Sequence, residues 1–257
     1  MTTAGNTSAT AEFTGKRALV TGGSRGIGAA VVRQFLDAGA QVLATARSAT
    51  NTVPEGATFV AADVRTRTGA QALAAAVEDT LGGVDIVVHN AGGAQPHRGS
   101  STIPDAEWQD ALDLNLLAAV RLDALLTPGM RDRGSGAIVH ISSAAVAAPV
   151  AQFLHYTAAK AALENYSLGL ATELAPFGIR VNTVSPGRTA TPGGEATRAQ
   201  WADLDPAAAG LDTPVVPLGR EGRPGDIAHA VMFLVSDNAS WLTGGSLVVD
   251  GGEFHRG

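Results

Sequence analysis

Short apolar runs and longer stretches rich in Ala and Leu alternate along the chain from residue 16 onward. The short runs contain many β-branched residues and are typical of strands, whereas the longer stretches favour helices. The predicted strands are Arg17–Val20, Gln41–Thr45, Thr58–Ala61, Val84–His89, Gly136–Ser142, Ile179–Val184 and Ser246–Val249. The predicted helices cover about 26–38, 68–81, 105–131, 156–175 and 225–236.

This alternation predicts an α/β protein with a parallel sheet. Runs such as Ile86–Val88 are apolar at every position, as expected of strands covered by helices on both faces. No Pro/Ser-rich linker interrupts the pattern. We therefore expect one doubly wound Rossmann domain over residues 15–257, with about seven parallel strands. A disordered tail is expected at 1–14, and a substrate lid at about 188–216 within an irregular stretch.

The composition of the chain excludes some classes of binding partner. The chain has 257 residues, a net charge of −6 and no basic stripe, which argues against nucleic acid and anionic membranes. No apolar run reaches the ~18 residues of a membrane helix. Without cysteine there is no disulfide, thiolate nucleophile or Cys-ligated zinc, and we expect no metal site and a cytoplasmic location.

A glycine-rich turn follows the first predicted strand and opens into the first helix. It reads Thr21-Gly22-Gly23-Ser24-Arg25-Gly26-Ile27-Gly28. Glycines at such a place permit a tight turn and a close approach to a pyrophosphate, whose charge suits the helix N-terminus. The alternative is a purely structural turn. Its position between strand and helix favours nucleotide binding, with contacts expected from Gly22, Ser24, Arg25, Gly26, Ile27 and Gly28.

The end of the second strand bears on the choice of cofactor. NAD-binding sites usually offer an acidic group to the ribose 2′-hydroxyl here, but this chain has Ala44-Thr45-Ala46-Arg47. Arg47 and Arg25 are suited to a 2′-phosphate, which guanidinium groups bind bidentately. Alternatively, both are solvated arginines in an arginine-rich chain. The sequence predicts that NADP(H) is preferred over NAD(H).

Two further motifs follow strands at the carboxyl edge of the sheet, where open α/β sheets bind ligands. Asp63-Val64 follows the third strand and is expected at the adenine amino group. Asn90-Ala91-Gly92 follows the fourth and is expected beside the adjacent ribose. Each motif taken alone is also typical of turns and helix caps.

Tyr156 and Lys160 are four residues apart in a predicted helix and therefore share one face. Acid/base work by a phenol of pKa about 10 near neutrality requires a shift of roughly three units, or about 4 kcal/mol. One permanent cation ~4 Å away supplies this at an effective dielectric constant near 20. The alternative is a surface pair with an extended lysine.

Two serines and one asparagine are further candidates for a site that includes this pair. Ser142 and Ser143 end the fifth strand, where a hydroxyl is placed to donate to a substrate carbonyl, or they are simply polar strand-end residues. No G-x-S-x-G elbow of a hydrolase surrounds Ser143. Asn115 lies in an apolar helical stretch, where it either interrupts the helix and binds water or is a satisfied core side chain.

In this order and spacing the motifs resemble those of the short-chain dehydrogenase/reductase family, in its compact single-domain form, from about Gly15 to Gly252. They are Thr21-Gly22-x-x-x-Gly26-x-Gly28, Asp63-Val64, Asn90-Ala91-Gly92, Asn115, Ser143, Tyr156-x-x-x-Lys160, Asn182-x-x-x-Pro186-Gly187 with Thr191, and Asp250-Gly251-Gly252. His89 departs from the family, which more often has asparagine there.

The resemblance implies roles for the catalytic residues. Tyr156 would be the general acid or base and Ser143, selected over Ser142 by the family spacing, would polarise the carbonyl. Lys160 would lower the Tyr156 pKa and bind the nicotinamide ribose, and Asn115 would hold a water in a proton relay. Further cofactor contacts are implied for Tyr156, Lys160, Pro186, Gly187, Thr189 and Thr191.

The implied activity is NADP(H)-dependent interconversion of a ketone and a secondary alcohol by hydride transfer. The implied assembly is a homotetramer packed through the helices at about 105–131 and 156–175. Expected substrate contacts come from Gln95, Ser143, Phe153, Tyr156 and Trp201. One alternative is a 3-oxoacyl-(acyl-carrier-protein) reductase, disfavoured by Phe177 where a basic residue often lies. Another is a non-catalytic nucleotide-binding regulatory protein, disfavoured by the intact set of catalytic residues.

Overall fold

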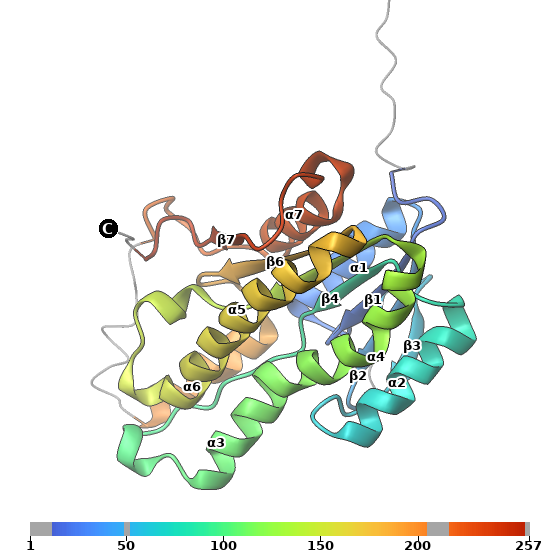
Figure 1. The fold of residues 1–257 in the computed structure, drawn as a ribbon. Coiled ribbons are helices and arrows are strands. Elements are labelled where there is room, and N and C mark those ends of the chain that lie inside the picture. Colours follow the sequence, from blue (N-terminus) through green and yellow to red (C-terminus); the bar gives the residue numbers. More distant parts are fainter. Residues whose placement is uncertain (1–11, 49–51, 205–215, 255–257) are drawn as a thin grey trace, which may run out of the picture.

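The computed structural model describes residues 12–48, 52–204 and 216–254 and contains one seven-stranded sheet (Figure 1). All strand pairs are parallel, in the order β3-β2-β1-β4-β5-β6-β7. The strands are β1 (Arg17–Thr21), β2 (Gln41–Ala46), β3 (Thr58–Ala61), β4 (Ile86–His89), β5 (Gly136–Ile141), β6 (Ile179–Pro186) and β7 (Ser246–Val249). The predicted Rossmann-type sheet is confirmed.

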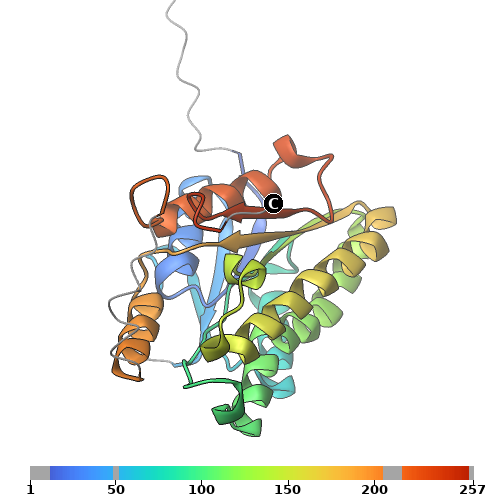
Figure 2. The same cartoon turned by 90° about the vertical axis from the view of Figure 1, so that its left-hand side faces the viewer.

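Helices cover both faces of the sheet (Figure 2). Helices α1 and α7 pack together on one face, and α2, α4 and α5 line the other. The helices are α1 (Gly26–Asp37), α2 (Arg67–Leu81), α3 (Asp105–Leu112), α4 (Ala118–Arg133), α5 (Leu154–Leu174), α6 (Pro192–Leu204) and α7 (Pro224–Val235). In the part of the chain that the structure describes, no helix is long and apolar enough to cross a membrane.

Adjacent residues of the central strands enter opposite cores. Val20 packs with Val31 and Phe35 of α1, whereas Leu19 packs in the core that contains Leu122 of α4. Both strand residues are fully buried. The continuous apolar character of these strands thus follows from the two helical layers.

The strand order of the sheet changes direction at β1. β1 pairs with β2 on one side and with β4 on the other, so the connections after β1 and β4 diverge. Open α/β sheets bind ligands at such a point, beyond the carboxyl ends of the strands. The glycine turn and the segment after β4 therefore border the same crevice.

Three segments differ from the sequence prediction. The helix expected at 105–131 contains a π-helical turn at Asp113–Leu117, which separates α3 from α4 without interrupting the rod. Helix α6 lies in the stretch expected to be irregular, and residues 205–215 of the expected lid are outside the described residues. Phe13 is buried against Phe35, so the folded domain begins before residue 15. The expected tail at 1–11 also lies outside the described residues.

Candidate active site

The glycine turn is fastened to the end of β4 by hydrogen bonds. The Thr21 Oγ1 atom accepts from the backbone N–H groups of Asn90 and Ala91, each at 3.0 Å. The Asn90 side-chain amide donates to the carbonyls of Thr21 and Gly22 at 3.0 and 3.1 Å. The structure therefore brings Asn90 to the predicted crevice, but its amide N–H bonds hold the turn in place.

Close packing explains the glycines of this turn. A Cβ on Gly28 would lie 2.2 Å from the Gly22 carbonyl oxygen, and Gly22 itself has φ +66°. A Cβ on Gly26 would lie 3.3 Å from Thr191, so the segment after β6 meets the turn directly. The glycine spacing thus matches the close contact of strand, helix and ligand that a dinucleotide site requires.

The start of α1 suits an anion. Its first turn contains no acidic residue, and the side chain of Arg25 at the N-cap does not cap the helix. The free N–H groups and the positive end of the helix dipole face the crevice. Arg25 and Arg47 are exposed, and neither forms a salt bridge with another described residue. These residues fit the phosphates of a dinucleotide.

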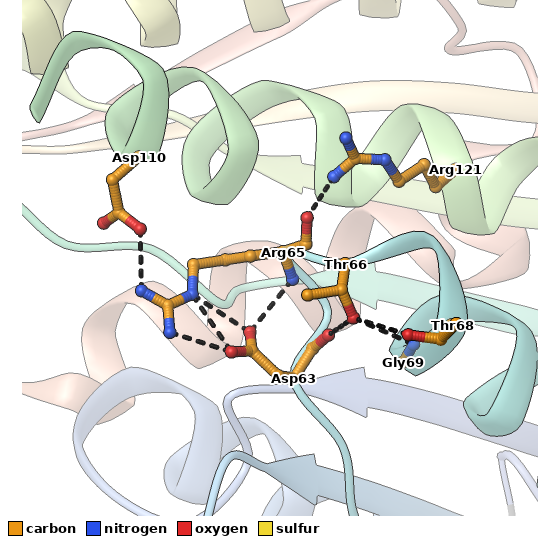
Figure 3. A network of polar contacts seen from close by, with 7 residues as sticks. All are labelled: Asp63, Arg65, Thr66, Thr68, Gly69, Asp110 and Arg121. Carbon is orange, nitrogen blue, oxygen red and sulfur yellow. Dashed lines mark hydrogen bonds and ion pairs between the residues drawn. The ribbon is translucent and has the colours of Figure 1, made fainter. Parts of the chain in front are cut away.

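Asp63 is held by an arginine that sequence reasoning missed (Figure 3). The Arg65 guanidinium binds Asp63 at 2.8 Å and Asp110 of α3 at 2.7 Å. Arg121 of α4 donates to the Arg65 carbonyl oxygen. Hydrogen bonding from Arg65 holds the pKa of Asp63 below its usual value, and the charge of Arg47 acts in the same direction. Asp63 is therefore an oriented carboxylate at the end of β3.

The turn after Asp63 leads directly into α2. Thr66 caps this helix by accepting from the Gly69 N–H at 3.0 Å, and its hydroxyl donates to the Asp63 carbonyl oxygen (Figure 3). The Val64 side chain is 4% exposed, so this residue offers a ligand its backbone rather than its side chain. Hydrogen bonds to the following helix thus fix the backbone of the predicted Asp63-Val64 motif.

Tyr156 and Lys160 lie in the first turns of α5, with the lysine turned into the protein. Lys160 is 3% exposed and its Nζ donates to the Ile141 carbonyl oxygen at 2.7 Å. The Nζ atom is 5.9 Å from the centroid of the Tyr156 ring. At that distance a full charge stabilises the phenolate by about 3 kcal/mol at an effective dielectric constant near 20. The surface-pair alternative is wrong.

Burial changes the proton affinity of both groups. It raises the pKa of Tyr156, and the Ser143 hydroxyl opposes that rise. It lowers the pKa of Lys160 to about 8. Lys160 is therefore still protonated at pH 7 but holds its proton less tightly than an exposed lysine, because it is enclosed by apolar protein.

The two serines after β5 point to different partners. The Ser142 hydroxyl is buried and lies 3.4 Å from the Lys160 carbonyl oxygen on α5. Ser143 Oγ accepts from the Ala145 N–H at 3.2 Å and is close enough to Tyr156 to affect its pKa. The structure thus brings Ser143, and not Ser142, to the phenol.

Asn115 lies in the π-helical turn, and its side chain is a buried, hydrogen-bonded core group, as the second of the two alternatives expects. Its amide donates to the carbonyls of Ala111 and Gly93 at 3.0 and 3.1 Å, and its Oδ1 accepts from the Gly93 N–H at 3.1 Å. A Cβ on Gly92 would lie 3.0 Å from Asn115 Oδ1 and 3.2 Å from Lys160 Nζ. Asn115 and Lys160 therefore lie side by side beneath the crevice.

Contacts join the segments that carry Gln95, Phe153 and Trp201, three of the residues predicted to bind substrate. The rings of Phe153 and Trp201 meet edge to face, with centroids 5.4 Å apart. Helix α6 is tied to the segment after β4 by Thr197 Oγ1, which donates to the Ala94 carbonyl at 3.2 Å. Gln95 is exposed beside that contact. An aromatic wall and a polar side chain thus come from three separate segments.

The segment after β6 leads from the crevice into α6. Pro186 ends β6, and the Gly187 N–H donates to the Val249 carbonyl at 3.0 Å. The Thr189 hydroxyl donates to the Gly187 carbonyl at 3.0 Å, and Thr191 Oγ1 accepts from the Gly194 N–H at 3.0 Å near the start of α6. These residues adjoin the glycine turn at Thr191, as a shared cofactor site requires.

Comparisons with known proteins agree with this geometry. A family model described as "Enoyl-(Acyl carrier protein) reductase" matches residues 22–253. L-fucose dehydrogenase of Mus musculus is 37% identical over 95% of this chain and 90% of its own length. The 3-oxoacyl-(acyl-carrier-protein) reductase FabG of Vibrio cholerae is 35% identical over 93% of this chain and 98% of its own length.

Solved structures give the same result. Levodione reductase superposes with a TM-score of 0.87 at 28% identity, covering 94% of this chain and 98% of that one. L-sorbose reductase from Gluconobacter frateurii, complexed with NADPH and L-sorbose, has a TM-score of 0.85 at 33% identity, covering 96% and 99%. The chain is an oxidoreductase acting on CH–OH groups with a nicotinamide cofactor, and it belongs to the short-chain dehydrogenase/reductase family.

Proposed function

We propose that this oxidoreductase uses NADP(H) in preference to NAD(H) to interconvert a small ketone and its secondary alcohol. The observation that carries the cofactor choice is the pair of exposed arginines, Arg25 and Arg47, which form no salt bridge with other described residues. No acidic group ends β2, where a 2′-hydroxyl would be bound. A solved relative, L-sorbose reductase, contains NADPH, which supports the proposal.

In the proposed mechanism the glycine turn and the segment after β6 would hold the nicotinamide cofactor, which would supply the hydride chemistry at the substrate carbon. Ser143 donates a hydrogen bond to the substrate oxygen and orients it toward Tyr156. In reduction the Tyr156 hydroxyl gives its proton to that oxygen, and in oxidation the phenolate takes the proton back. Lys160 stabilises the phenolate, and Asn115 fixes the segment after β4 beside the lysine.

The names of the relatives suggest two substrate classes. L-fucose dehydrogenase and L-sorbose reductase act on sugars, which favours a polyhydroxylated ketone or alcohol in a site bordered by Gln95, Phe153 and Trp201. The similarity to FabG supports a second candidate, a 3-oxoacyl thioester. Phe177, whose ring stacks on the Arg131 guanidinium at 4.8 Å, is the feature that disfavours the thioester. We therefore propose the small-molecule substrate first.

The test is a panel of ketones, sugars and 3-oxoacyl thioesters followed by absorbance of the reduced nicotinamide. We expect kcat/KM for NADPH to exceed that for NADH, and Arg47→Asp to reverse or abolish this preference. Arg33→Asp, an exposed arginine on the outer side of α1, is the matched charge control and should leave it unchanged. A wild-type preference for NADH would refute the cofactor assignment.

Tyr156→Phe tests the catalytic role. Removal of the only proton donor proposed for the substrate oxygen should cost at least about 10²-fold in kcat, while the dissociation constant for NADPH stays within a few-fold. Full activity in this variant would refute the mechanism. Retained cofactor binding without turnover on any panel member, in the wild-type chain, would instead support the non-catalytic regulatory alternative.

We also propose a cytoplasmic homotetramer. Two separate faces carry exposed apolar side chains: Leu125 and Leu168 lie on α4 and α5, and Trp241 and Leu247 lie at the β7 edge. Two self-complementary faces are what a tetramer with two kinds of interface needs. Analytical ultracentrifugation of the wild type and of Leu168→Glu tests this, because loss of one interface should yield dimers.

A further inference from the structure

Three enclosed side-chain nitrogens lack a hydrogen-bond partner among the residues that the structure describes, and they lie in segments that contact one another. They are His97 Nε2, His155 Nδ1 and Trp201 Nε1. The remaining atom of this kind in the described chain, Arg131 Nε, lies on α4 beside Phe177. Enclosed polar atoms in folded proteins are nearly always paired, so each exception requires an explanation. Three exceptions in adjoining segments indicate a shared partner from outside the chain.

The two histidines are brought together by contacts between the segment after β4 and the start of α5. Their imidazole rings meet edge to face, with centroids 5.3 Å apart. The His97 backbone N–H donates to the Gln152 carbonyl oxygen at 3.0 Å, which fixes its segment against the chain that leads into α5. His155 is 2% exposed and directly precedes Tyr156 in α5. The histidine pair is therefore adjacent in the chain to the proposed proton donor.

Trp201 reaches the same segments from α6. Its ring meets that of Phe153 edge to face, with centroids 5.4 Å apart, and Phe153 lies two residues before His155. Thr197 lies one helical turn before Trp201 on the same face of α6, and its hydroxyl donates to the Ala94 carbonyl oxygen at 3.2 Å. One face of α6 thus contacts both segments that carry the histidines.

The donor and acceptor pattern of the three nitrogens fits hydroxyl groups. An indole N–H only donates, whereas a neutral imidazole donates from one ring nitrogen and accepts at the other. Burial lowers the pKa of His155, and the nearby His97 acts in the same direction, so the His155 ring is neutral at pH 7. The charge of Glu107 also acts on His155 and disfavours an anion beside it. An alcohol group, which both donates and accepts, therefore matches these atoms better than a carboxylate or a phosphate.

Helix α6 covers this place but is lightly held. None of its side chains is fully buried. Besides the contacts of Thr197 and Trp201, its ties to the rest of the described chain include an ion pair between Arg198 and Glu221 at 3.8 Å. An element with few buried contacts opens at a low free-energy cost. The structure therefore allows α6 to move aside when a substrate enters and to return over it.

We propose that His97, His155 and Trp201 form a specificity subsite for hydroxyl groups that the substrate carries on carbons other than the reacting one. This inference rests on the proposed function, in which Tyr156 and Ser143 bind the reacting oxygen. Trp201 donates its N–H to one hydroxyl oxygen, and the two imidazoles exchange hydrogen bonds with a second hydroxyl. An alkyl ketone or a 3-oxoacyl chain leaves these nitrogens unpaired and is disfavoured for that reason. The subsite thus selects a polyhydroxylated ketone or its alcohol.

Trp201→Phe removes the indole N–H and keeps an aromatic ring against Phe153. The probes are 1,3-dihydroxyacetone and pentan-3-one, which have the same shape but carry hydroxyl and methyl groups, respectively, at their ends. The ratio of kcat/KM for dihydroxyacetone to that for pentan-3-one should fall about tenfold, as expected for one lost hydrogen bond. Trp108→Phe is the matched control. Trp108 also meets His155 edge to face, with centroids 6.1 Å apart, but its nitrogen is not among the enclosed, unpaired atoms.

His97→Phe and His155→Phe test the other two nitrogens, since each keeps a planar ring in the edge-to-face contact. Each should lower the same ratio of kcat/KM while leaving the value for pentan-3-one nearly unchanged. A wild-type ratio in all three variants would overturn the proposal and assign buried water as the partner of these nitrogens. An equal loss for both ketones, accompanied by a lower Tm, would also overturn it, because the residues would then serve packing alone.

A binding measurement without turnover separates this inference from the proposed function. NMR can follow the indole N–H signals of the three tryptophans in the chain saturated with oxidised cofactor, which has no hydride to give to a ketone. Trp201→Phe identifies the signal of Trp201. Dihydroxyacetone or L-sorbose should move this signal downfield and slow its exchange with deuterated solvent, whereas pentan-3-one should do neither.

The two proposals fail in different ways in these experiments. An unchanged Trp201 signal with both hydroxylated probes would refute the subsite even if the chain reduces ketones. A downfield shift without turnover of any ketone in the panel would uphold the subsite and refute the proposed function.

Discussion

Gly28→Ala gives the sharpest test of the glycine turn. The added Cβ would lie 2.2 Å from the Gly22 carbonyl oxygen and 2.5 Å from Asn90 Nδ2. Ordinary contacts begin near 3.4 Å, so the start of α1 and the turn must separate by about 1 Å. Both atoms belong to the hydrogen bond between Asn90 and Gly22, which the separation would break.

The expected cost follows from these contacts. Forcing one extra carbon into a packed region costs about 2 kcal/mol, in the middle of the range for such changes. The lost hydrogen bond to Gly22 adds about 1 kcal/mol. If the turn adopts its present form only when the cofactor is bound, the total of about 3 kcal/mol weakens binding and raises the dissociation constant for NADPH roughly 100-fold. If the strain is present in the free chain, it lowers Tm by about 6–12 °C.

The assay is titration of the cofactor by fluorescence together with calorimetric Tm of the free chain. Gly169→Ala is the control, because a Cβ at Gly169 on α5 would meet nothing within 4 Å. This control should keep wild-type affinity and gain up to about 1 kcal/mol from helix propensity. Wild-type affinity and wild-type Tm together in Gly28→Ala would refute the reasoning about the turn.

Three further changes test separate contacts. The pKa of Lys160 is about 8 in the folded chain, below its value in the unfolded chain. Between pH 8 and 10.5 the unfolded chain therefore binds more protons than the folded chain. The free energy of unfolding must then rise with pH over this range. Urea unfolding should show the wild type gaining about 3 kcal/mol relative to Lys160→Met over this range, and a flat difference would contradict the buried cation. Arg180→Met removes four hydrogen bonds to carbonyls at the end of α7 and in the turn that follows it, and should lower the calorimetric Tm by several degrees. An unchanged Tm would show that water replaces these bonds. Arg65→Gln should raise KM for NADPH several-fold with kcat unchanged, because Asp63 loses its partner, and steady-state kinetics showing equal KM would assign Arg65 to stability alone.

The sheet was predictable because each strand has its own local signal. Runs such as Ile86–Val88 are short, apolar at every position and β-branched, which favours a buried strand over a helix. Helix α6 was not predictable in the same way. Its residues Pro192–Leu204 have no fully buried side chain among them, so no apolar stripe marks the helix. It is held by local capping at Thr191, by the bond from Thr197 and by contacts of Arg198 with Glu221 and of Trp201 with Phe153, none of which a periodicity argument detects.

The candidate active site likewise has some features with a signal in the sequence and others without one. The choice of Tyr156, Ser143 and Asn115 as site residues followed from their match to the motifs of the resembling family, but the proton affinities did not, since the pKa of Lys160 depends on how completely the protein encloses it. The buried hydrogen bonds that Asp123 forms with His89, His140 and Tyr166 also had no signal in the sequence. Asp123 lies within an apparently ordinary helix, and its partners come from β4, β5 and α5, so only the fold brings them together.

The π-helical turn at Asp113–Leu117 makes the fold sensitive to the number of residues in this helix. Each residue of an α-helix advances the facing direction by about 100°, so one extra residue in a turn rotates everything that follows. Helix α3 packs on α5, whereas α4 packs on α2 and β5, and one continuous rod serves these different neighbours through that rotation. Deleting a single residue here would restore an unbroken helix, yet it would swing Asp123 out of the core and expose Leu122. Deletion of one residue from this helix should therefore destabilise the fold, whereas a surface loop tolerates such a deletion.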